Sequence, residues 1–459
     1  MSEALEQIQQ ARPRRFRPYP EYKDSGVEWL GEIPAHWEVK RLRSTVVTCQ
    51  NGVWGDEADG VNDIICVRVA DFDRVGLRVV IDKPTFRSVE PRLVQARQIN
   101  RRDLLLEKSG GGEKQPVGAL VMYDHDEPAV CSNFVARVQV ADGHHSRFLT
   151  YLHAALYAAR INTRSIKQST GIQNLDSASY LNEVVGLPQV GEQRAIAAFL
   201  DRETAKIDGL VARKERLIEL LQEKRTALIT RAVTRGLDPN VPMKDSGVEW
   251  LGEIPAHWEV APVYARYQVA LGKMLDAKRV TGKAGGRYLR NVDVQWDAVN
   301  ADGLPEMDFA PNERDRYLLR PGDLLVCEGG EVGRTAIWHG ELEECFYQKA
   351  IHRVRPASAN EAPRFFYYLM HALAKRGVFS AGGNPNTIDH LTAIQLRRYR
   401  MSFAPRDEQR AIAAFLDLET ARIDALIAKI REAIDYLTEF RTALISAAVT
   451  GKIDVREEA

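Results

Sequence analysis

Two long segments of the chain carry apolar residues at the spacing of an amphipathic helix. In the second segment apolar residues recur every seven positions, with others between them: Ile423, Ile430, Leu437 and Leu444, then Leu426, Ile427, Ala433, Ile434 and Phe440. Such a heptad pattern is typical of a helix that packs against another helix. The first segment keeps Ile207, Leu221 and Leu228 but places Lys214 and Lys224 within the pattern. We expect these lysines at a solvated edge of the seam, and the alternative is contact with another protein.

Prolines and glycines mark the ends of both predicted helices. Pro188 and Pro405 precede the two segments, and Asp407 stands where it would cap the second helix. Gly236 and Gly451 are stop signals. Each helix is predicted to span roughly 44 residues, or ~66 Å at the usual rise per residue. A helix this long, without enough neighbouring chain to cover it, most easily buries its apolar stripe against its own duplicate.

The chain is a duplication of one pattern. The letters KDSGVEWLGEIPAHWEV occupy residues 23–39 and again residues 244–260, and EQRAIAAFLD occupies residues 192–201 and 408–417. The segments between these blocks share far less. Core packing tolerates apolar substitutions and would not keep exposed charged residues identical. Recent duplication explains the identity but not the contrasting divergence, so we interpret the chain as two copies of a constant frame around variable inserts.

Short apolar runs between glycine-rich turns predict strands in the first insert, at 104–106, 119–122 and 134–138. The second insert repeats the plan, with 322–326 in place of 102–106 and 331–334 in place of the turn 115–118. Helices are predicted to follow, over 147–160 and 363–376. Each insert is therefore predicted to be a mixed α/β domain. The predicted domains are 1–190 and 244–406 for the α/β domains, 191–243 for the central helix and linker, and 407–459 for the C-terminal helix.

Composition places the chain among globular proteins. It has 459 residues, 45% hydrophobic and 27% charged, which excludes collagen-like, disulfide-scaffold and wholly disordered proteins. Lys plus Arg and Asp plus Glu both number 63, so nucleic-acid binding would need locally segregated charge. The five cysteines form no C-x-x-C pair, and we expect reduced thiols. Because no apolar signal region and no apolar stretch of ~18 residues is found, we expect a cytoplasmic protein.

The chain lacks the motifs of common catalytic and metal sites. Residues 282–284 (GKA) lack the hydroxyl residue that follows the lysine of a phosphate-binding loop. Residues 384–386 (NPN) match the N-P-P-[YF] motif of amino-methyltransferases only in part. Asp323 with Glu328 resembles a nuclease acidic pair, but Gly330 stands where that pattern has Lys. The histidines show no metal-binding spacing, and we predict neither a catalytic nor a metal site.

Two stretches of locally positive charge are candidates for DNA contact. Residues 278–290 contain five cations and no acid, and residues 160–174 contain three cations and no acid among many Asn, Gln, Ser and Thr. Arg and Lys neutralise phosphates, while Asn, Gln and Arg make bidentate contacts with base edges. The alternative for each stretch is a solvated loop. Together with polar residues near the turns, the predicted DNA-contact residues are Lys108, Ser109, Lys114, Gln115, Arg164, Lys167, Gln168, Gln173, Asn174, Lys278, Arg279, Lys283, Arg287, Arg290, Arg334, Gln348, Lys349, Asn384 and Asn386.

The repeated blocks resemble those of a known family. KDSGVEWLGEIPAHWEV at the start of each half, with LPQVGEQRAIAAFLD and APRDEQRAIAAFLD at the start of each long helix, resemble the specificity subunit of type I restriction-modification systems. The resemblance covers residues 22–454. It implies two target-recognition domains separated by two long antiparallel helices in a coiled coil, related by a pseudo-twofold axis. It also implies recognition of a bipartite DNA target, in which an unread spacer separates two half-sites.

The resemblance further implies a non-catalytic chain that works in a complex. Members of this family dock two methylation subunits, which carry S-adenosylmethionine, and in the full complex two restriction subunits. No cofactor is expected on this chain. Because the two halves are near-equivalent, each should offer one site to an identical partner. The predicted partner-binding residues lie at the starts of the two helices: Glu192, Arg194, Phe199, Glu408, Arg410 and Phe415.

Two alternatives stand beside this interpretation. A duplicated coiled-coil scaffold that joins proteins without touching DNA would explain the helices, but not the divergent inserts with their acid-free basic loops. A stand-alone enzyme would need turnover by the purified chain with no partner present. The chain also departs from the family pattern at residues 404–406, where APR replaces the apolar-proline run, and in the Arg-rich segment before Tyr22, which has no counterpart in the second half.

Overall fold

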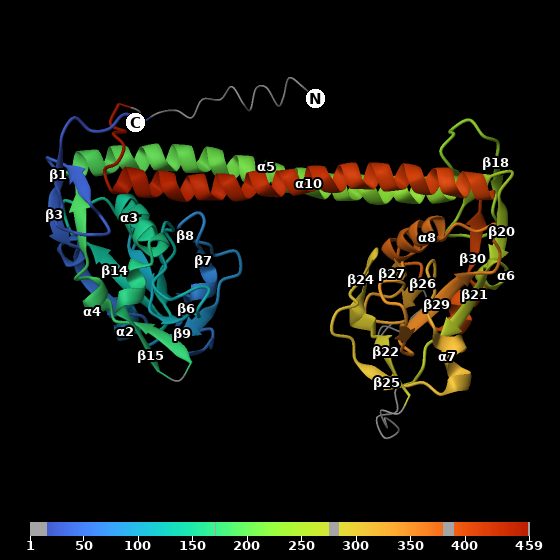
Figure 1. Ribbon diagram of the computed structural model, residues 1–459. Coiled ribbons are helices and arrows are strands. Elements are labelled where there is room, and N and C mark those ends of the chain that lie inside the picture. The colour runs from blue at the N-terminus through green and yellow to red at the C-terminus, as the bar shows by residue number, and fades with distance from the viewer. Residues whose placement is uncertain (1–15, 170, 275–283, 380–389, 458–459) are drawn as a thin grey trace. The chain divides into compact units, whose positions relative to one another are not determined.

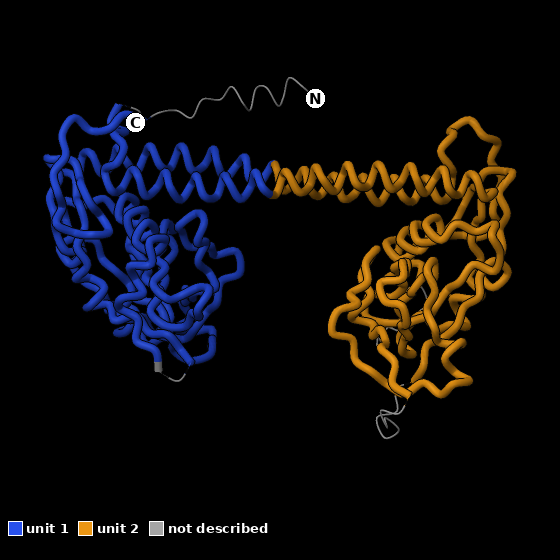
Figure 2. Tube along the Cα trace, viewed as in Figure 1, with its two compact units in different colours: residues 1–213, 432–459 blue, residues 214–431 orange. Residues whose placement is uncertain are grey.

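The computed structural model describes residues 16–169, 171–274, 284–379 and 390–457. It divides into two compact units, Met1–Arg213 with Glu432–Ala459 and Lys214–Arg431 (Figure 2). Both division points fall inside long helices, so each unit contains the start of one long helix and the end of the other. The predicted domain boundaries follow the sequence blocks instead, and they stay predictions.

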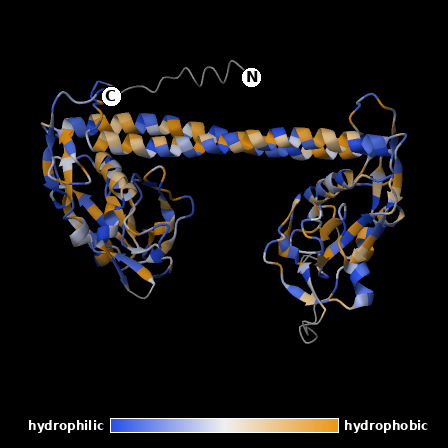
Figure 3. Cartoon of the chain, viewed as in Figure 1, coloured by the Kyte–Doolittle hydropathy of each residue, from blue (hydrophilic) through white to orange (hydrophobic). Residues whose placement is uncertain are grey.

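The two predicted long helices are α5, Val190–Arg235, with 46 residues, and α10, Arg406–Val449, with 44 residues (Figure 1). Within each unit the two helices run antiparallel, and hydrophobic and hydrophilic residues alternate along both of them (Figure 3). Gly236 and Gly451 take left-handed conformations at φ +73° and +72°, which ends each helix. The predicted lengths and stop signals are confirmed.

The heptad seam of α10 is confirmed in part. Ile423, Ile430 and Leu444 are buried, with exposed fractions of 7, 6 and 4%. Phe440 is 41% exposed and Leu426 is 45% exposed, so the prediction that they belong to the seam is wrong. A single neighbouring helix covers only a narrow stripe, and residues at the flank of that stripe stay in contact with solvent.

Polar residues of the long helices also test the sequence predictions. Asp407 is the second residue of α10 and lies inside its first turn, while the carbonyl of Pro405 accepts the N–H of Gln409 at 2.9 Å. The prediction that Asp407 caps this helix is wrong, because the helix begins one residue earlier. Lys224 is exposed and Lys214 is half-buried, in agreement with a solvated edge.

A mixed sheet with the strand order β4-β14-β10-β12-β8-β7 forms the centre of the first unit (Figure 1). Leu104 and Leu106 of β10 pack in one cluster with α3 (Ser146–Ala158), and Leu105 packs in another cluster with Val121. A strand that is covered on both faces reads as a continuous apolar run. The predicted strands and helix of the first insert are confirmed. The strands are β4 Val46–Asn51, β7 Phe72–Asp73, β8 Arg78–Val79, β10 Leu104–Glu107, β12 Leu120–Met122 and β14 Val135–Val140.

Smaller sheets complete the first unit, in the orders β13-β6-β9-β5, β11-β16-β15, β17-β3 and β1-β2. Their strands are β1 Tyr22–Asp24, β2 Glu32–Pro34, β3 Glu38–Arg41, β5 Asp56–Glu57, β6 Asp63–Val67, β9 Phe86–Ser88, β11 Ser109–Gly110, β13 Ala129–Cys131, β15 Ile166–Ser169, β16 Ile172–Leu175 and β17 Val184–Leu187. The short helices are α2 Pro91–Arg97 and α4 Ser177–Tyr180.

The second unit has the same plan, with the central strand order β21-β29-β26-β27 and α8 (Pro363–Lys375) packed beside it. Phe365, Phe366, Leu369 and Leu373 of α8 are buried in its core, as their spacing predicted. The central strands are β21 Tyr267–Leu271, β26 Leu324–Cys327, β27 Thr335–Ile337 and β29 Ile351–Pro356. The other elements are β18 Met243–Asp245, β19 Glu253–Pro255, β20 Glu259–Pro262, α6 Val263–Arg266, β22 Gly285–Leu289, β23 Val294–Gln295, β24 Ala298–Val299, β25 Glu306–Asp308, α7 Pro311–Tyr317, β28 Phe346–Tyr347, α9 Ala393–Arg398 and β30 Arg400–Phe403.

The identical blocks at residues 23–39 and 244–260 form identical local structures. In each block an aspartate accepts the N–H of the glycine two residues later, Asp24 that of Gly26 at 2.9 Å and Asp245 that of Gly247 at 3.0 Å. The second tryptophan of each block is fully buried in the core of its own unit; these residues are Trp37 and Trp258. Packing and turn formation therefore restrict many positions of the block in both units.

Within the described ranges, the helices include none that is long and apolar enough to cross a membrane. The same residues contain no group of His, Cys, Asp and Glu side chains that could hold a metal ion.

Candidate nucleic-acid interface

Polar side chains of the first unit gather on the sheet β11-β16-β15. Ser109 lies directly opposite Asn174, and Asn174 lies directly opposite Lys167, so the three residues form a row across the strands. Directly opposite residues of neighbouring strands share one face of a sheet. The Ser109 hydroxyl donates to the Asn174 Oδ1 at 2.6 Å, which orients that amide. Lys167 donates to Asp176 at 2.7 Å, and this hydrogen bond lowers the pKa of the Asp176 carboxyl.

The two glutamines of this sheet lie opposite one another but differ in exposure. Gln168 is exposed on β15, while Gln173 on β16 is 8% exposed. The side-chain oxygen of Gln173 accepts the N–H of Val117 at 3.3 Å and so holds the loop that carries Lys114 and Gln115. Gln173 is therefore a loop-positioning residue in this structure, and Gln168 remains available to solvent.

The other predicted residues of the first unit surround this sheet. Lys108 precedes β11 and donates to Asn51 at 2.8 Å, and Arg164 lies 3.6 Å from Glu183. Lys114 and Gln115 are exposed. The structure therefore brings the polar stretch 160–174 and the glycine-rich turn after β10, which are distant in sequence, to one surface of the first unit.

The predicted residues of the second unit are less uniform. Lys278, Arg279, Lys283, Asn384 and Asn386 lie outside the described residues, and their predicted DNA contact stays a prediction. Arg287 is exposed on β22, opposite Glu306 of β25. Gln348 is half-buried and Lys349 is exposed, both in the turn before β29.

Two of the predicted arginines form contacts inside the second unit. Arg290 donates to both carboxylate oxygens of Asp293 at 2.8 and 2.9 Å, and this hydrogen bonding raises the pKa of Arg290. Arg68 and Asp71 make the same contact in the first unit, which indicates a framework role for the pair. Arg334 is half-buried and donates to the backbone and side-chain oxygens of Asn291, both at 2.9 Å.

An exposed aromatic group beside the polar row was not predicted from the sequence. Trp54 is 39% exposed and Phe134 is 47% exposed, and both line one pocket with Ser109 and Asn133. Asn133 and Phe134 lie in the first unit where Lys349 and its neighbour lie in the second, at an offset of 216 residues. This is the offset of the repeated EQRAIAAFLD block, so applying it to Lys349 would have found them.

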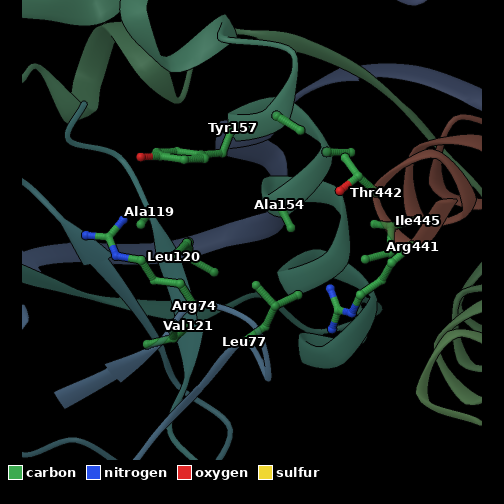
Figure 4. A pocket seen from close by; sticks show the side chains of 12 residues that line it. Arg74, Leu77, Ala119, Leu120, Val121, Ala154, Tyr157, Arg441, Thr442 and Ile445 are labelled. Atoms are coloured by element: carbon green, nitrogen blue, oxygen red, sulfur yellow. The ribbon is translucent and has the colours of Figure 1, made fainter. Parts of the chain in front are cut away.

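A second pocket of the first unit is lined by residues that do not belong to the polar row. It is lined by Leu77, Ala154, Tyr157 and Ile445, and Arg74 at its rim donates to the buried Glu107 at 2.9 Å (Figure 4). Burial raises the pKa of this carboxyl. None of the residues that line this pocket is among the predicted DNA-contact residues.

The predicted partner-binding residues at the start of α5 make contacts inside the first unit. Glu192 accepts hydrogen bonds from the Tyr19 hydroxyl at 2.7 Å and from the Trp37 indole at 3.0 Å, and it lies 2.8 Å from the His36 ring. Burial, and then the hydrogen bond to Glu192, raise the pKa of Tyr19. Phe199 is fully buried. Partner contact through the Phe199 side chain therefore conflicts with its place in the core.

The start of α10 repeats the histidine contact in the second unit, but among the described residues the Trp258 indole N–H has no hydrogen-bond partner there. Glu408 lies 2.7 Å from the His257 ring, and Phe415 is half-buried against the core. Arg194 in the first unit and Arg410 in the second are exposed. The partner-binding prediction stays a prediction, and these two arginines are the members of the predicted set that are classed as exposed.

The identity of the EQRAIAAFLD blocks follows from how each helix holds its α/β domain. Gln193 donates to the Pro188 carbonyl and accepts the His145 N–H, both at 2.9 Å, and Gln409 makes the matching pair of bonds in the second unit. Asp201 accepts hydrogen bonds from Arg147 and Tyr151 of α3, both at 2.7 Å. The second unit repeats these contacts with Asp417, Arg364 and Tyr368.

A family model and a curated protein that are similar to this chain both describe specificity proteins of type I restriction systems. The family model described as the type I restriction modification DNA specificity domain matches residues 298–436. The specificity subunit of the type I restriction enzyme MjaVIII from Methanocaldococcus jannaschii is 23% identical over 316 residues, which cover 67% of this chain and 70% of that protein.

Solved structures share the fold. A chain from a study of complex assembly and conformational transition in the type I R-M system aligns with a TM-score of 0.65 at 18% identity, covering 91% of this chain and 98% of that chain. The HsdS subunit from Thermoanaerobacter tengcongensis aligns with a TM-score of 0.56 at 16% identity, covering 92% and 98%. Mixed α/β domains joined to long helices are thus an arrangement with precedent.

Proposed function

We propose that this chain, which belongs to the family of type I restriction-modification specificity subunits, supplies DNA sequence specificity to a complex and is not itself the catalyst. The observation that carries this function is a framework built twice around different exposed polar residues. Arg68 with Asp71 and Arg290 with Asp293 belong to the framework. Among the described residues, the row Ser109, Asn174 and Lys167 is found in the first unit. A repeated framework with different exposed side chains suits the reading of two different half-sites.

The partners that we propose are duplex DNA, two methylation subunits and, in the full complex, two restriction subunits. S-adenosylmethionine would be bound by the methylation subunits, and this chain would bind no cofactor. Each unit begins one long helix with the same block and exposes one arginine there, Arg194 or Arg410. Two equivalent surfaces support two identical partners.

The test of this function is a binding selection. The chain, purified with its methylation partner, is incubated with a library of duplexes of random sequence, and the bound duplexes are sequenced. We expect one bipartite site with an unread spacer. Replacing residues 40–191 by the corresponding insert of another family member should change one half-site and leave the other unaltered. A coiled-coil scaffold that joins only proteins would enrich no sequence.

A further inference from the structure

The β-turn between β13 and β14 of the first unit has a structural equivalent in the second unit. The N–H of Val135 donates to the Ser132 carbonyl at 3.0 Å and closes the first turn, and the N–H of Ile351 donates to the Gln348 carbonyl at 3.0 Å and closes the second. We call residues 132–135 and 348–351 the reading turns. Their central residues are Asn133 with Phe134 in the first unit, and Lys349 with Ala350 in the second.

The backbone around the two reading turns is the same. Gly52 donates to the Val135 carbonyl at 2.9 Å, and Gly272 donates to the Ile351 carbonyl at 3.1 Å. A Cβ atom on Gly52 would lie 2.4 Å from the Ser132 carbonyl oxygen, and one on Gly272 would lie 2.2 Å from the equivalent carbonyl oxygen of Gln348. Only glycine fits at either position, so the backbone of the two turns is held in the same way.

The side chains at the two turns differ completely in chemistry. Asn133 is exposed beside Phe134, and Trp54 borders the same pocket. The equivalents in the second unit are Lys349, Ala350 and Met274. Among the described residues, neither the Asn133 amide nor the Lys349 ammonium has a hydrogen-bond or ion-pair partner. An unpaired polar group beside a backbone arrangement that both units share is well placed to bind a ligand without a cost to the fold.

The residue that donates its backbone N–H to each reading turn differs in charge between the two units. Lys108 donates its N–H to the carbonyl of Phe134 at 2.8 Å, and Glu328 donates its N–H to the carbonyl of Ala350 at 3.0 Å. Lysine therefore lies beside the turn in the first unit, and glutamate lies there in the second.

The side chains at the two reading turns match different base pairs in the major groove of DNA. Asparagine forms two hydrogen bonds with the N6 and N7 edge of adenine, and an apolar side chain contacts the methyl group of thymine. Lysine binds O6 and N7 of guanine, and glutamate accepts the amino group of cytosine. Resting on the function proposed above, we propose that the first reading turn recognises an A·T pair through Asn133 and Phe134, and the second a G·C pair through Lys349 and Glu328.

The pocket beside the first reading turn fits this assignment. Trp54 is fixed because Arg87 donates to its carbonyl oxygen at 3.3 Å and to that of Gly55 at 3.1 Å, and the Arg87 guanidinium lies 4.6 Å from the Trp54 ring centre. The Trp54 ring lines the same pocket as Phe134 and would give the thymine methyl group an apolar surface. In the second unit Met274, which is 64% exposed, takes this position.

The test uses the chain with its methylation partner and the same random duplex library. The wild type should require an A·T pair at one position of the half-site read by residues 40–191, and a G·C pair in the other half-site. Asn133→Ala should reduce discrimination at that A·T position by roughly 5- to 150-fold. The double variant Asn133→Lys with Phe134→Ala should change the preference there to G·C. The second half-site should stay unaltered in each case.

A control variant separates base reading from general damage. Val61→Ala changes a side chain that is 80% exposed and lies outside the pocket, and it should leave both half-sites unaltered. All variants should keep the wild-type melting temperature, because the changed side chains are exposed. The proposal is overturned if a folded Asn133→Ala variant selects the wild-type first half-site, or if its change falls in the second half-site. Failure of the wild type to select any sequence would instead overturn the proposed function, and the proposal with it.

Discussion

Arg441 of α10 binds Asp208 of α5 at 2.9 Å and also donates to the carbonyl oxygen of Val75 at 2.6 Å. One guanidinium thus joins both long helices and the loop between β7 and β8 within the first unit. The second unit has the matching pair with the helices exchanged, since Arg225 of α5 binds Asp424 of α10 at 3.0 Å.

We expect Arg441→Ala to destabilise the first unit. The Arg441 side chain is 12% exposed, and its removal leaves the Asp208 carboxylate and the Val75 carbonyl without their donor. The loss should be about 1–3 kcal/mol of unfolding free energy, measured by chemical denaturation. Arg431→Ala, which changes an exposed arginine of the same helix, is the matched control and should have little effect. Equal stability of the two variants would show that the Arg441 contacts contribute nothing.

Stability should fall as the pH is lowered toward 5, because two histidines are buried. Burial lowers the pKa of His153 and of His371 to about 4 each. Unfolded histidine has a pKa near ~6.5, so the unfolded chain binds more protons between these values, and stability present above pH ~6.5 is lost as the pH falls. Each histidine should contribute about 2 kcal/mol of this loss between pH 7.5 and pH 5.

The measurement is the unfolding free energy of wild type and His153→Gln as a function of pH. The difference between the two proteins should shrink by about 2 kcal/mol as the pH falls from 7.5 to 5. His339→Gln, which changes an exposed histidine, serves as control. A constant difference across this range would contradict a buried neutral His153.

Gly209→Ala should stabilise the chain. Gly209 lies inside α5, and a Cβ atom at this position would meet no other atom within 4 Å. Alanine is favoured over glycine in a helix interior by about 0.5–1 kcal/mol, because glycine loses more backbone entropy on folding. The gain should appear as a higher melting temperature. Gly52→Ala is the contrasting variant and should destabilise, since its Cβ would lie 1.9 Å from the Cys131 carbonyl oxygen.

Arg287 and Arg290 should respond differently to removal. Arg287→Ala should lower the slope of log binding constant against log salt by roughly 0.9 if one phosphate contact is lost, with similar weakening for all sequences. Arg290→Ala should instead reduce stability, since Arg290 is held by Asp293. Fluorescence anisotropy with duplex DNA at several salt concentrations, beside a thermal melt, measures both. An unchanged slope in Arg287→Ala would place β22 away from the DNA.

The sequence predicts the elements better than it predicts the surfaces. The heptads and stop glycines identified α5 and α10 because helix periodicity and helix ends are local properties. The row of Ser109, Asn174 and Lys167 depends on the register between strands that are distant in sequence. Ser109 lies 58 residues before Lys167, the nearer of its two partners in the chain. No local pattern sets that register, so the residues were identified but their row was not.

Hydrogen bonding inside the chain explains the other differences. Arg290 was predicted to contact DNA from local charge alone, although Asp293 three residues later binds it. Glu192 and Phe199 were predicted to face a partner. In the structure Glu192 accepts a hydrogen bond from the Trp37 indole, and the Phe199 side chain is buried in the core. Identity between repeats marks positions under a shared constraint, and in this chain much of that constraint is the attachment of each α/β domain to its helix.

The reading turns also bear on how such a protein could evolve. Each turn is closed by backbone hydrogen bonds of its outer residues and is anchored by Gly52 or Gly272, so Asn133, Phe134, Lys349 and Ala350 contribute no side-chain hydrogen bond to the described fold. Mutations at these four positions should change the free energy of unfolding little, whereas many core substitutions lower it enough to be removed by selection. Target preference at the turns is therefore free to drift while folding stays under purifying selection, and a lineage could acquire a new recognition sequence through one or two codon changes.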